Sequence, residues 1–263
     1  ACGAGAGAPG RGSPMKGVIM AGGEGTRLRP LTSTVPKPLL PVANRPMMEH
    51  VVNLLARHGF DEIVVTVAYL ASAIRNYFGD GSEFGVRMVY ATEESPLGTA
   101  GSVRNAMDEL QERFLVISGD VLTDIDLSAI WATHVAKGAL ATIGLTPVDN
   151  PLEFGIVITK EDGSIERFLE KPTWGQVFSD TINTGIYVLD PRVFSYIPMM
   201  SRSGTKPSAF MRRTFATKIA ASVSDLNFSI GPFARAVPSF TVTMNPRDSS
   251  SAMKVSRAAS SAT

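Results

Sequence analysis

A glycine-rich turn near the amino terminus is followed by two cations in a proline-rich loop. Residues 21–38 read AGGEGTRLRPLTSTVPKP and follow an apolar run at residues 16–20 that predicts a buried first strand. Glycines lack a Cβ, so they can take positive φ and let phosphate oxygens approach the backbone amides. Arg27 and Lys37 place a guanidinium and an ammonium beside this turn. The combination favours binding of a nucleotide's phosphates.

Two familiar phosphate loops do not fit this turn. A Walker A loop needs GxxxxGK[ST], and no lysine follows these glycines at that spacing. The dinucleotide fingerprint needs GxGxxG, but Leu28 stands where the third glycine would be. Five prolines between residues 30 and 46 exclude an immediate long helix. The simpler alternative is an ordinary glycine turn with solvated Arg27 and Lys37.

Strands and helices are predicted to alternate along the chain. Apolar runs predict strands at residues 63–67, 86–90, 114–118 and 140–146, and helical spacing predicts helices at residues 46–58, 70–78, 99–110 and 127–136. We expect Asn44 to cap the first helix, with Pro46 in its first turn. This alternation predicts an α/β, Rossmann-like fold with a mainly parallel sheet and helices on both faces. Apolar segments at residues 155–159, 165–169 and 185–189 predict a smaller, mixed region.

Ligands of such sheets bind outside the carboxyl ends of the strands. The glycine loop, the turn at residues 96–99 and Asp120, which follows the strand at 114–118, all fall at that edge. A carboxylate at this position can hold Mg²⁺ against phosphate oxygens. Helix capping is the alternative for an aspartate in such a place, and Asp124 and Asp126 are the nearby candidates for it.

The glycine loop resembles the signature of the sugar nucleotidyltransferases, or nucleotide-sugar pyrophosphorylases. That signature reads GGxGTRLxPLT and then PKPLxPV, and residues 22–32 and 36–42 match it without a gap. Within this family the chain looks most similar to the mannose-1-phosphate guanylyltransferases. The resemblance runs from about Met15 to Pro198. It implies nucleotidyl transfer from a nucleoside triphosphate, with GTP favoured, to a hexose 1-phosphate, with mannose 1-phosphate favoured.

The resemblance also implies roles for individual residues. Arg27 and Lys37 would be catalytic, and Asp120 would bind a Mg²⁺ cofactor. The nucleotide would contact Gly22, Gly23, Gly25, Thr26, Glu93, Gly98 and Thr99. The sugar phosphate would contact Gly155, Glu170, Lys171 and Asn183.

Glu93 bears on the choice of base. By resemblance it lies where relatives place a base-reading residue. A carboxylate can accept hydrogen bonds from guanine N1–H and N2–H₂, and neither adenine nor thymine offers that pair of donors. A solvated loop acid is the alternative interpretation of Glu93.

Composition limits the compartment and the partners. One cysteine, Cys2, excludes an internal disulfide framework, and no apolar run reaches membrane-spanning length. We therefore expect a cytoplasmic protein. Residues 1–198 carry a net charge of −6 and residues 199–263 a net charge of +7. The basic segment has no recognisable nucleic-acid motif, so we expect neither nucleic acid nor a membrane as partner. A homo-oligomer is left open.

Three segments are expected. Residues 1–14 read as a disordered extension, residues 15–198 as a nucleotidyltransferase domain, and residues 199–263 as a divergent tail. The family continues with a W-x-D-x-G-T turn whose aspartate is a second metal ligand, but no tryptophan lies beyond Trp174. The hypothesis for the tail is a non-homologous end from a changed reading frame or an altered splice, and reading the coding DNA in its other frames would test the first of these.

This departure leaves alternatives to an active enzyme. The first is a catalytically impaired, nucleotide-sugar-binding relative that acts as a regulatory subunit or sensor. The second is a poorly folded fragment, and a Rossmann oxidoreductase is a more distant interpretation.

Overall fold

The computed structural model describes residues 15–95, 97–148, 150, 155–159, 165–170, 181–197, 227–233, 239–245 and 254–255. The predicted extension at residues 1–14 and the sugar-phosphate candidate Lys171 lie outside these ranges. All statements below concern the described residues.

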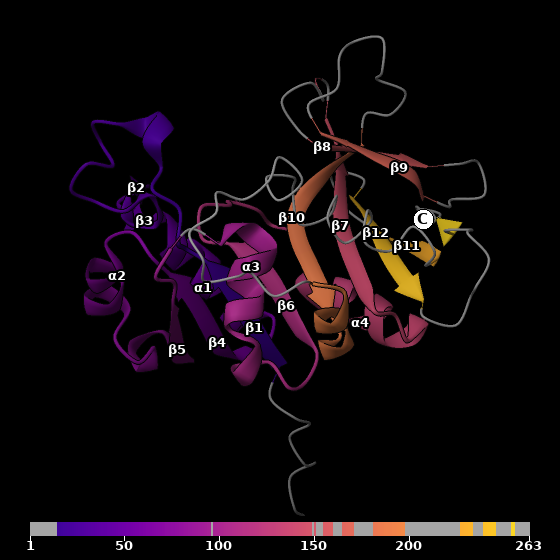
Figure 1. Cartoon of the computed structure of the whole chain (residues 1–263), viewed down its shortest axis with the longest axis horizontal. Helices are drawn as coiled ribbons and strands as arrows, with labels where there is room; N and C mark the ends of the chain where they lie inside the picture. The colour runs from indigo at the N-terminus through magenta and orange to yellow at the C-terminus, as the bar shows by residue number, and fades with distance from the viewer. Residues whose placement is uncertain are drawn as a thin grey trace, which may run out of the picture.

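A mixed sheet organises the molecule (Figure 1). Its strand order is β13-β11-β12-β7-β10-β6-β1-β4-β5. Strands β6, β1, β4 and β5 pair in parallel, and β10 runs antiparallel to both β6 and β7. The strands of the central part are β1 Met15–Met20, β4 Phe60–Val67, β5 Arg87–Thr92, β6 Phe114–Ser118, β7 Ala141–Pro147 and β10 Thr181–Leu189. The predicted mainly parallel α/β sheet is confirmed.

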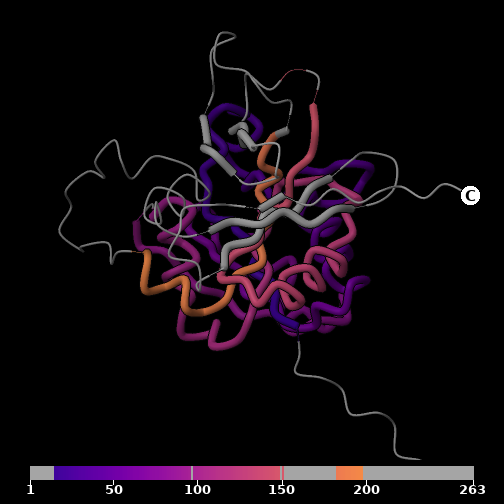
Figure 2. Tube along the Cα trace, turned by 90° about the vertical axis from the view of Figure 1, so that its right-hand side faces the viewer, coloured from indigo at the N-terminus to yellow at the C-terminus, as the bar shows by residue number. Residues whose placement is uncertain are grey.

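Alternating side chains of the central strands belong to two hydrophobic clusters, one on each face of the sheet. In β1, Val18 belongs to one cluster and Ile19 to the other, and both are fully buried. This period of two is what a strand covered on both faces requires. Helix α3 and the 3-10 helix η7 contribute to the first cluster, whereas α1, α2 and α4 contribute to the second. Figure 2 shows α3 and α4 on opposite sides of the sheet.

Helices α1, α2 and α4 begin and end within one residue of the positions that the apolar spacing predicts. Their bounds are α1 Met47–Arg57, α2 Ala71–Phe78, α3 Gly98–Asn105 and α4 Leu127–Lys137, and the 3-10 helices are η1 Thr26–Leu28, η2 Lys37–Leu39, η3 Ser82–Phe84, η4 Met107–Glu109 and η7 Pro191–Tyr196. The helix predicted at residues 99–110 is divided into α3 and η4.

The predicted start of the first helix is wrong. Asn44 has φ 62° in the turn between two short strands, β2 Pro41–Val42 and β3 Arg45–Pro46, so it does not cap α1. Pro46 ends β3, and α1 begins at Met47. Ala43 and Asn44 both take positive φ, which is the geometry of a tight two-residue hairpin. Asparagine tolerates this conformation, so the hairpin turn competes with helix capping for the same residue.

Smaller strands extend the sheet beyond β7 and β10. β8 Gly155–Thr159 pairs with β9 Ile165–Glu170 and contacts β10 at one position. β11 Asn227–Phe233, β12 Ser239–Asn245 and β13 Lys254–Val255 come from the segment expected to be a divergent tail, and β12 pairs with β7. Among the described helices, none has both the length and the apolar character needed to cross a bilayer.

The strand order reverses direction at β1. The chain passes from β1 to β4 and β5 on one side and then returns to place β6 on the other side. In open α/β sheets such a switch point leaves a crevice at the carboxyl ends of the two strands next to it. The glycine loop follows β1 and Asp120 follows β6, so both leave the sheet at this point.

Candidate active site

The glycine loop turns sharply at Gly25. This residue has φ 62°, and a Cβ added there would lie 3.0 Å from Thr32 Cγ2 and 3.1 Å from Lys37 Cβ. A side chain would therefore meet both a left-handed backbone and two close neighbours. Gly25 is required for the loop to fold back so that residue 37 lies beside residue 25.

Thr32 closes the same loop. Its side chain is fully buried, and its Oγ1 donates a hydrogen bond to the Gly25 carbonyl at 2.9 Å. Inside this closed loop, Thr26 and Arg27 begin η1, with the Leu28 amide bonded to the Gly25 carbonyl at 2.9 Å. The Arg27 side chain is exposed and makes no hydrogen bond or ion pair with any described residue. Its guanidinium is therefore free to meet an anion.

Lys37 and Asp120 form an ion pair at the rim of the sheet. Pro36 and Pro38, both buried, flank Lys37, and its Nζ contacts Asp120 Oδ2. About 30% of each side chain is exposed, so both groups are accessible from solvent. Asp120 does not cap a helix. Asp126 does so instead, because its Oδ1 accepts the Ala129 amide at 3.1 Å.

Glu93 lies at the other end of the loop and is buried, with 7% of its surface exposed. A Cβ added at Gly22 would lie 3.1 Å from Glu93 Oε1, so the first glycine of the loop packs against this carboxyl group. The amide of Glu93 donates to the Val67 carbonyl at 2.8 Å, which fixes the residue beside the end of β4. The solvated loop acid is therefore the wrong interpretation.

The surroundings of the Glu93 carboxyl group are neutral. Burial raises its pKa, and Ser102, the Leu97 amide and Thr66 lower the pKa by smaller amounts. Glu93 Oε1 and Thr66 Oγ1 are buried without a hydrogen-bond partner among the described residues. The Thr66 hydroxyl nevertheless faces the carboxyl group closely enough to lower its pKa, so the available group is the buried carboxyl oxygen, which can accept a donor from a ligand.

The start of α3 lies next to the Glu93 carboxyl group. Gly98 is the first residue of α3 and has φ 66°, and Ser102 Oγ donates back to the Gly98 carbonyl at 2.9 Å. Thr99 follows in the first turn and is half-buried. Because Ser102 and Leu97 also face Glu93, the predicted nucleotide residues of α3 lie close to the predicted base-reading residue.

Three sugar-phosphate candidates meet at one corner of the sheet. Gly155 is the register partner of Glu170 in the β8–β9 pair, and Ile156 pairs with Ile182, the neighbour of Asn183. The Asn183 side chain spans an irregularity in β10: its Nδ2 donates to the Tyr187 hydroxyl at 2.8 Å, and its Oδ1 accepts the Gly185 amide at 2.9 Å.

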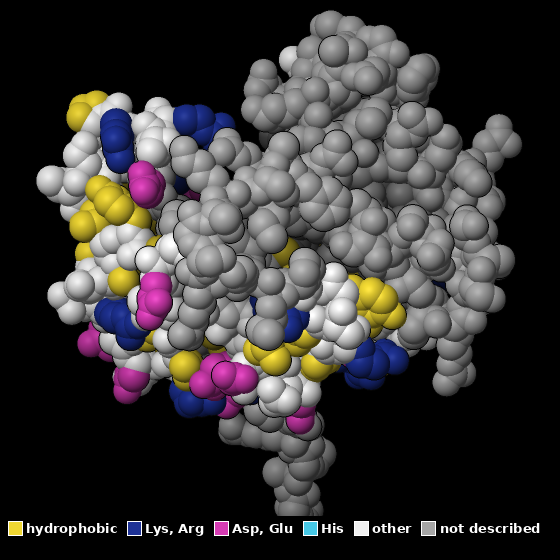
Figure 3. Space-filling view, viewed as in Figure 1, with side chains coloured by type: hydrophobic (Ala, Val, Ile, Leu, Met, Phe, Trp, Pro, Cys, Tyr) yellow, Lys and Arg dark blue, Asp and Glu magenta, His cyan; other side chains and the backbone are white. Residues whose placement is uncertain are grey.

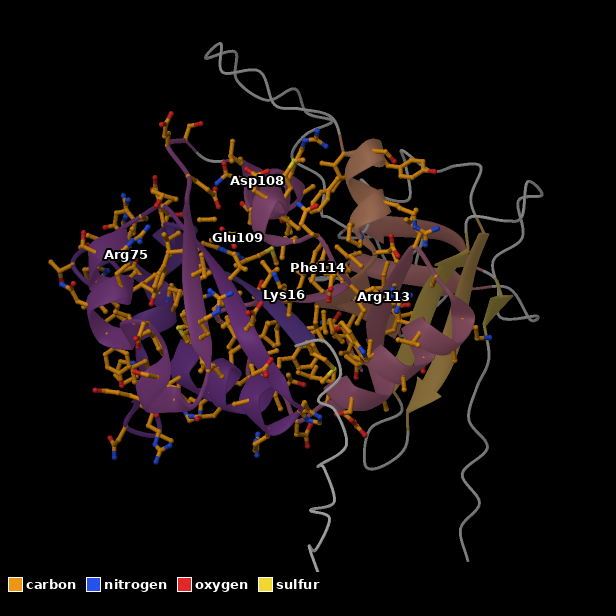
Figure 4. The ribbon with its side chains drawn as sticks, turned by 90° about the horizontal axis from the view of Figure 1, so that it is seen from below. Lys16, Arg75, Asp108, Glu109, Arg113 and Phe114 are labelled. Carbon is orange, nitrogen blue, oxygen red and sulfur yellow. The ribbon has the colours of Figure 1, made fainter. Side chains whose placement is uncertain are left out.

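The opposite edge of the sheet has a different character. Figure 4 shows Lys16, Glu109 and Phe114 together at the amino-terminal ends of the strands. Lys16 Nζ donates to the Glu109 carbonyl at 2.8 Å and pairs with Glu62 at 3.3 Å. These contacts join structural elements to one another. The loops with orphaned or exposed polar groups lie at the carboxyl edge.

The donor set near Asp120 fits a metal that takes most of its ligands from a substrate. No cluster of three or more His, Cys, Asp or Glu residues in the described chain could hold a metal by itself. Mg²⁺ is commonly held by one or two carboxylates together with substrate phosphates, and Asp120 is one exposed carboxylate at the rim.

The structure thus brings together most of the predicted nucleotide residues. Residues that the sequence analysis did not identify also shape the site: Thr32 closes the loop, and Thr66 and Ser102 face Glu93. Thr32 carries a local signal, since a hydroxyl in a proline-rich loop often bonds to nearby backbone. Thr66 and Ser102 carry none, because each lies in an element whose apolar pattern predicts only packing.

Comparisons with known proteins agree on one family. The family model described as Nucleotidyl transferase matches residues 16–229. A UTP–glucose-1-phosphate uridylyltransferase of Synechocystis sp. is 41% identical over 198 residues, which are 70% of this chain and 51% of the relative. A mannose-1-phosphate guanyltransferase of Candida albicans is 39% identical over 76% of this chain and 55% of the relative. Mannose-1-phosphate guanylyltransferase 1 of Arabidopsis thaliana is 36% identical over 89% and 62%.

A solved structure shares the fold. A Bacillus anthracis protein described as a glucose-1-phosphate thymidylyltransferase superposes with a TM-score of 0.68 at 32% identity, over 79% of this chain and 81% of that one. The chain spans between 51% and 62% of the length of the curated relatives above. With a family model that covers most of its residues and relatives near 40% identity, the chain belongs to the Nucleotidyl transferase family.

Proposed function

We propose that this protein transfers a nucleotidyl group from a nucleoside triphosphate to a hexose 1-phosphate, and that GTP and mannose 1-phosphate are its substrates. The observation that carries the proposal is the arrangement at one sheet edge. A glycine loop with a free guanidinium, an accessible lysine–aspartate pair and a buried carboxyl group whose Oε1 has no partner among the described residues lie along this edge. Relatives that act on UTP and glucose 1-phosphate share the family, so the base and the hexose are the finer part of this proposal.

The reaction needs positioning and charge neutralisation. A sugar phosphate oxygen attacks the α-phosphorus, the bond from that phosphorus to the β-phosphate oxygen breaks, and pyrophosphate leaves. Arg27 binds the β- and γ-phosphate oxygens and stabilises the departing pyrophosphate, because a guanidinium can form two parallel hydrogen bonds. Lys37 binds the α-phosphate, where negative charge builds in the transition state. The backbone of Gly22, Gly23, Gly25 and Thr26 lines the phosphates.

Asp120 is the residue that would hold Mg²⁺, which when bound neutralises charge on the triphosphate oxygens. In the structure Lys37 balances the charge of this carboxylate. Asp120 therefore needs no second protein cation before the substrates arrive.

Glu93 selects guanine in this proposal. A carboxylate has only acceptors, and guanine presents N1–H and N2–H₂ side by side. Gly22 permits the close approach, because its missing side chain leaves space next to Glu93 Oε1. Gly98 and Thr99 line the remaining side of the base at the start of α3.

The hexose 1-phosphate binds at the β8–β10 corner. Gly155 and Glu170 are opposite each other there, and Asn183 lies one residue from the β8–β10 contact. In the proposal Glu170 and Asn183 bind sugar hydroxyls, Gly155 permits close approach of the ring, and Lys171 binds the phosphate.

The distribution of charge on the described surface is also compatible with small anionic substrates. Figure 3 shows Lys and Arg side chains interspersed with Asp and Glu over the described part of one face, without a continuous basic strip of the kind that nucleic acid favours. We expect no nucleic-acid or membrane partner. A second copy of this chain stays the open possibility for a protein partner, and a cytoplasmic location stays a prediction.

Release of pyrophosphate tests the function directly. The purified chain is incubated with Mg²⁺ and each of four nucleoside triphosphates against mannose or glucose 1-phosphate. We expect pyrophosphate only when both substrates are present, with the highest rate for GTP and mannose 1-phosphate. A highest rate with UTP or dTTP would overturn the guanine assignment and leave the transfer chemistry intact. No pyrophosphate from any pair would overturn the enzymatic function.

A second candidate function is nucleotide-sugar binding without turnover, as a regulatory subunit or sensor. It is favoured by the single carboxylate at the metal position in the described chain, since a second carboxylate would hold the metal more firmly. Calorimetry distinguishes the two functions. Binding of GTP or of a guanine nucleotide sugar, without pyrophosphate release under any condition, would select the binding protein.

A further inference from the structure

Between Gly22 and Lys37, the loop that carries Arg27 receives one side-chain hydrogen bond from the rest of the described protein. Within residues 22–36, the backbone hydrogen bonds run between residues of the loop itself, such as Leu31 to Leu28 and Ser33 to Pro30. The Tyr69 hydroxyl is different. It lies 3.1 Å from the Thr32 carbonyl and 3.0 Å from the Ser33 carbonyl, so it donates a shared hydrogen bond to two consecutive carbonyls. Among the described residues it is the only side chain from outside residues 22–36 that donates a hydrogen bond to this loop.

Tyr69 is itself held in an uncommon geometry. It lies between the end of β4 and the start of α2, at the same carboxyl edge as the glycine loop. The next residue, Leu70, has φ 50°, which is rare for a bulky side chain and costs backbone energy. Such strain persists where the surroundings impose it. Here the left-handed residue turns the chain out of the sheet and into α2, directly after the tyrosine.

We infer that Tyr69 is a positioning residue for the nucleotide site, whose hydroxyl holds the loop of residues 22–36 against the sheet so that Arg27 and Lys37 meet the same triphosphate. The inference rests on the proposed function for the identity of the ligand. The expected effect of Tyr69 on the loop does not depend on the proposed function. Tyr69 bonds next to Thr32, and Thr32 bonds to Gly25, so the constraint reaches the residue whose turn brings Lys37 into place.

The sequence offers a local probe of this loop. Trypsin cleaves after lysine and arginine unless proline follows. Arg29, Lys37 and Arg45 all precede proline, so Arg27–Leu28 is the only susceptible bond between Gly17 and Ala56. The initial rate of cleavage at this bond reports how often the loop leaves its folded position.

The test compares Tyr69→Phe with Tyr90→Phe. Tyr90 is a matched control, because its hydroxyl also donates to a backbone carbonyl, that of Gly79, at 2.7 Å, and it lies in strand β5. We expect Tyr69→Phe to speed cleavage at Arg27–Leu28 roughly five-fold, the effect of one neutral hydrogen bond, and Tyr90→Phe to leave it within about two-fold of wild type. Equal rates in the two variants would overturn the inference. So would an equal acceleration at Arg57–His58, since that pattern indicates global unfolding.

A nucleotide arm separates this inference from the proposed function. GTP with Mg²⁺ should slow cleavage at Arg27–Leu28 in the wild type, and Tyr69→Phe should raise the KM for GTP about five-fold with a smaller change in kcat, because the competent loop is populated less often. Faster cleavage in Tyr69→Phe without protection by any nucleoside triphosphate would support the positioning role and contradict the proposed function. A change in kcat alone would contradict the positioning role.

Discussion

Two carboxyl groups at the same sheet edge differ in exposure and in their partners. Asp120 is about one-third exposed and pairs with the Lys37 ammonium. Glu93 is 7% exposed, faces only neutral groups and leaves Oε1 without a partner. A protein that needed both acids only for stability would pair both, because an unpartnered buried carboxyl group is costly. In the proposed function, this difference suits two chemically different parts of one ligand at the two ends of the glycine loop.

The two environments match the two parts of a nucleotide. Polyphosphate needs mobile, solvent-accessible counter-charges, and an ion pair at the rim provides a cation and an anion that can exchange partners. A neutral base needs fixed hydrogen-bond acceptors in a place from which water is excluded, since water would compete for them. The buried surroundings of Glu93 meet this second requirement. Substitutions at the two ends should therefore affect different measurements, and this expectation can be tested one residue at a time.

The largest effect is expected at Lys37. Lys37→Ala should lower kcat on the order of 10²- to 10³-fold while triphosphate affinity falls much less, because the ammonium acts where charge develops in the transition state. Arg29→Ala is the matched control, since Arg29 lies in the same loop and only pairs with Glu24 at 3.3 Å on the exposed surface. Steady-state kinetics and nucleotide titration measure both quantities. Equal losses of rate and affinity would mean that Lys37 binds the ground state.

Asp120→Asn should act on the same end of the site through the metal. We expect the affinity of the enzyme–GTP complex for Mn²⁺, read by electron paramagnetic resonance, to fall by about 10- to 100-fold, because an amide is a weaker ligand than a carboxylate. Base preference should not change. Asp124→Asn is the control, since Asp124 is exposed in the segment that follows β6. If the two variants bind Mn²⁺ equally well, Asp120 is not a metal ligand.

Glu93→Gln should act on the other end. The carboxamide has one acceptor where the carboxylate has two, so we expect the ratio of kcat/KM for GTP over UTP to fall roughly 10- to 100-fold. The metal affinity should stay as in the wild type. Glu94→Gln, at the exposed neighbouring position, serves as the matched control. An unchanged ratio in Glu93→Gln would show that the buried carboxyl group does not read the base.

The end of the site at Lys37 and Asp120 can be predicted from the sequence better than the surroundings of Glu93. The strand at 114–118 and the glycine loop follow from local patterns, and the loop's residue types already indicate phosphate chemistry. Parallel strands then require that the residues after β1 and β6 emerge at the same edge, which predicts that the glycine loop and Asp120 lie there together. This part of the site depends on chain order and strand direction, and both can be read from one sequence.

The burial of Glu93 could not be predicted in the same way. Its neighbours come from three separate elements, namely Gly22, Thr66 and Ser102, and no local pattern records that they converge. The turn at Asn44 cannot be predicted locally, because asparagine suits both a helix cap and a left-handed turn, and only pairing of β2 with β3 decides between them. Tyr69 also has no local sequence signal, because its hydroxyl donates to two carbonyls that lie more than thirty residues earlier in the chain.

The smallest effect is expected in the free energy of unfolding, which the buried Glu93 carboxylate should lower near neutral pH. Burial raises its pKa above the ordinary value of 4.5, so the folded chain binds more protons than the unfolded chain as pH rises from 4.5 to the raised value. The free energy of unfolding must fall over that range, and the stabilising contribution of the neutral acid is complete only below 4.5. Glu93→Gln, which stays neutral, should match the wild type below that pH and exceed it near neutrality by about 1 kcal/mol, the scale of a single substitution. Urea unfolding between pH 4.5 and 8 measures the difference, with Glu94→Gln as the control. A difference that does not grow with pH would mean that the Glu93 carboxylate already has a partner in the folded protein, and the contrast with Asp120 would no longer hold.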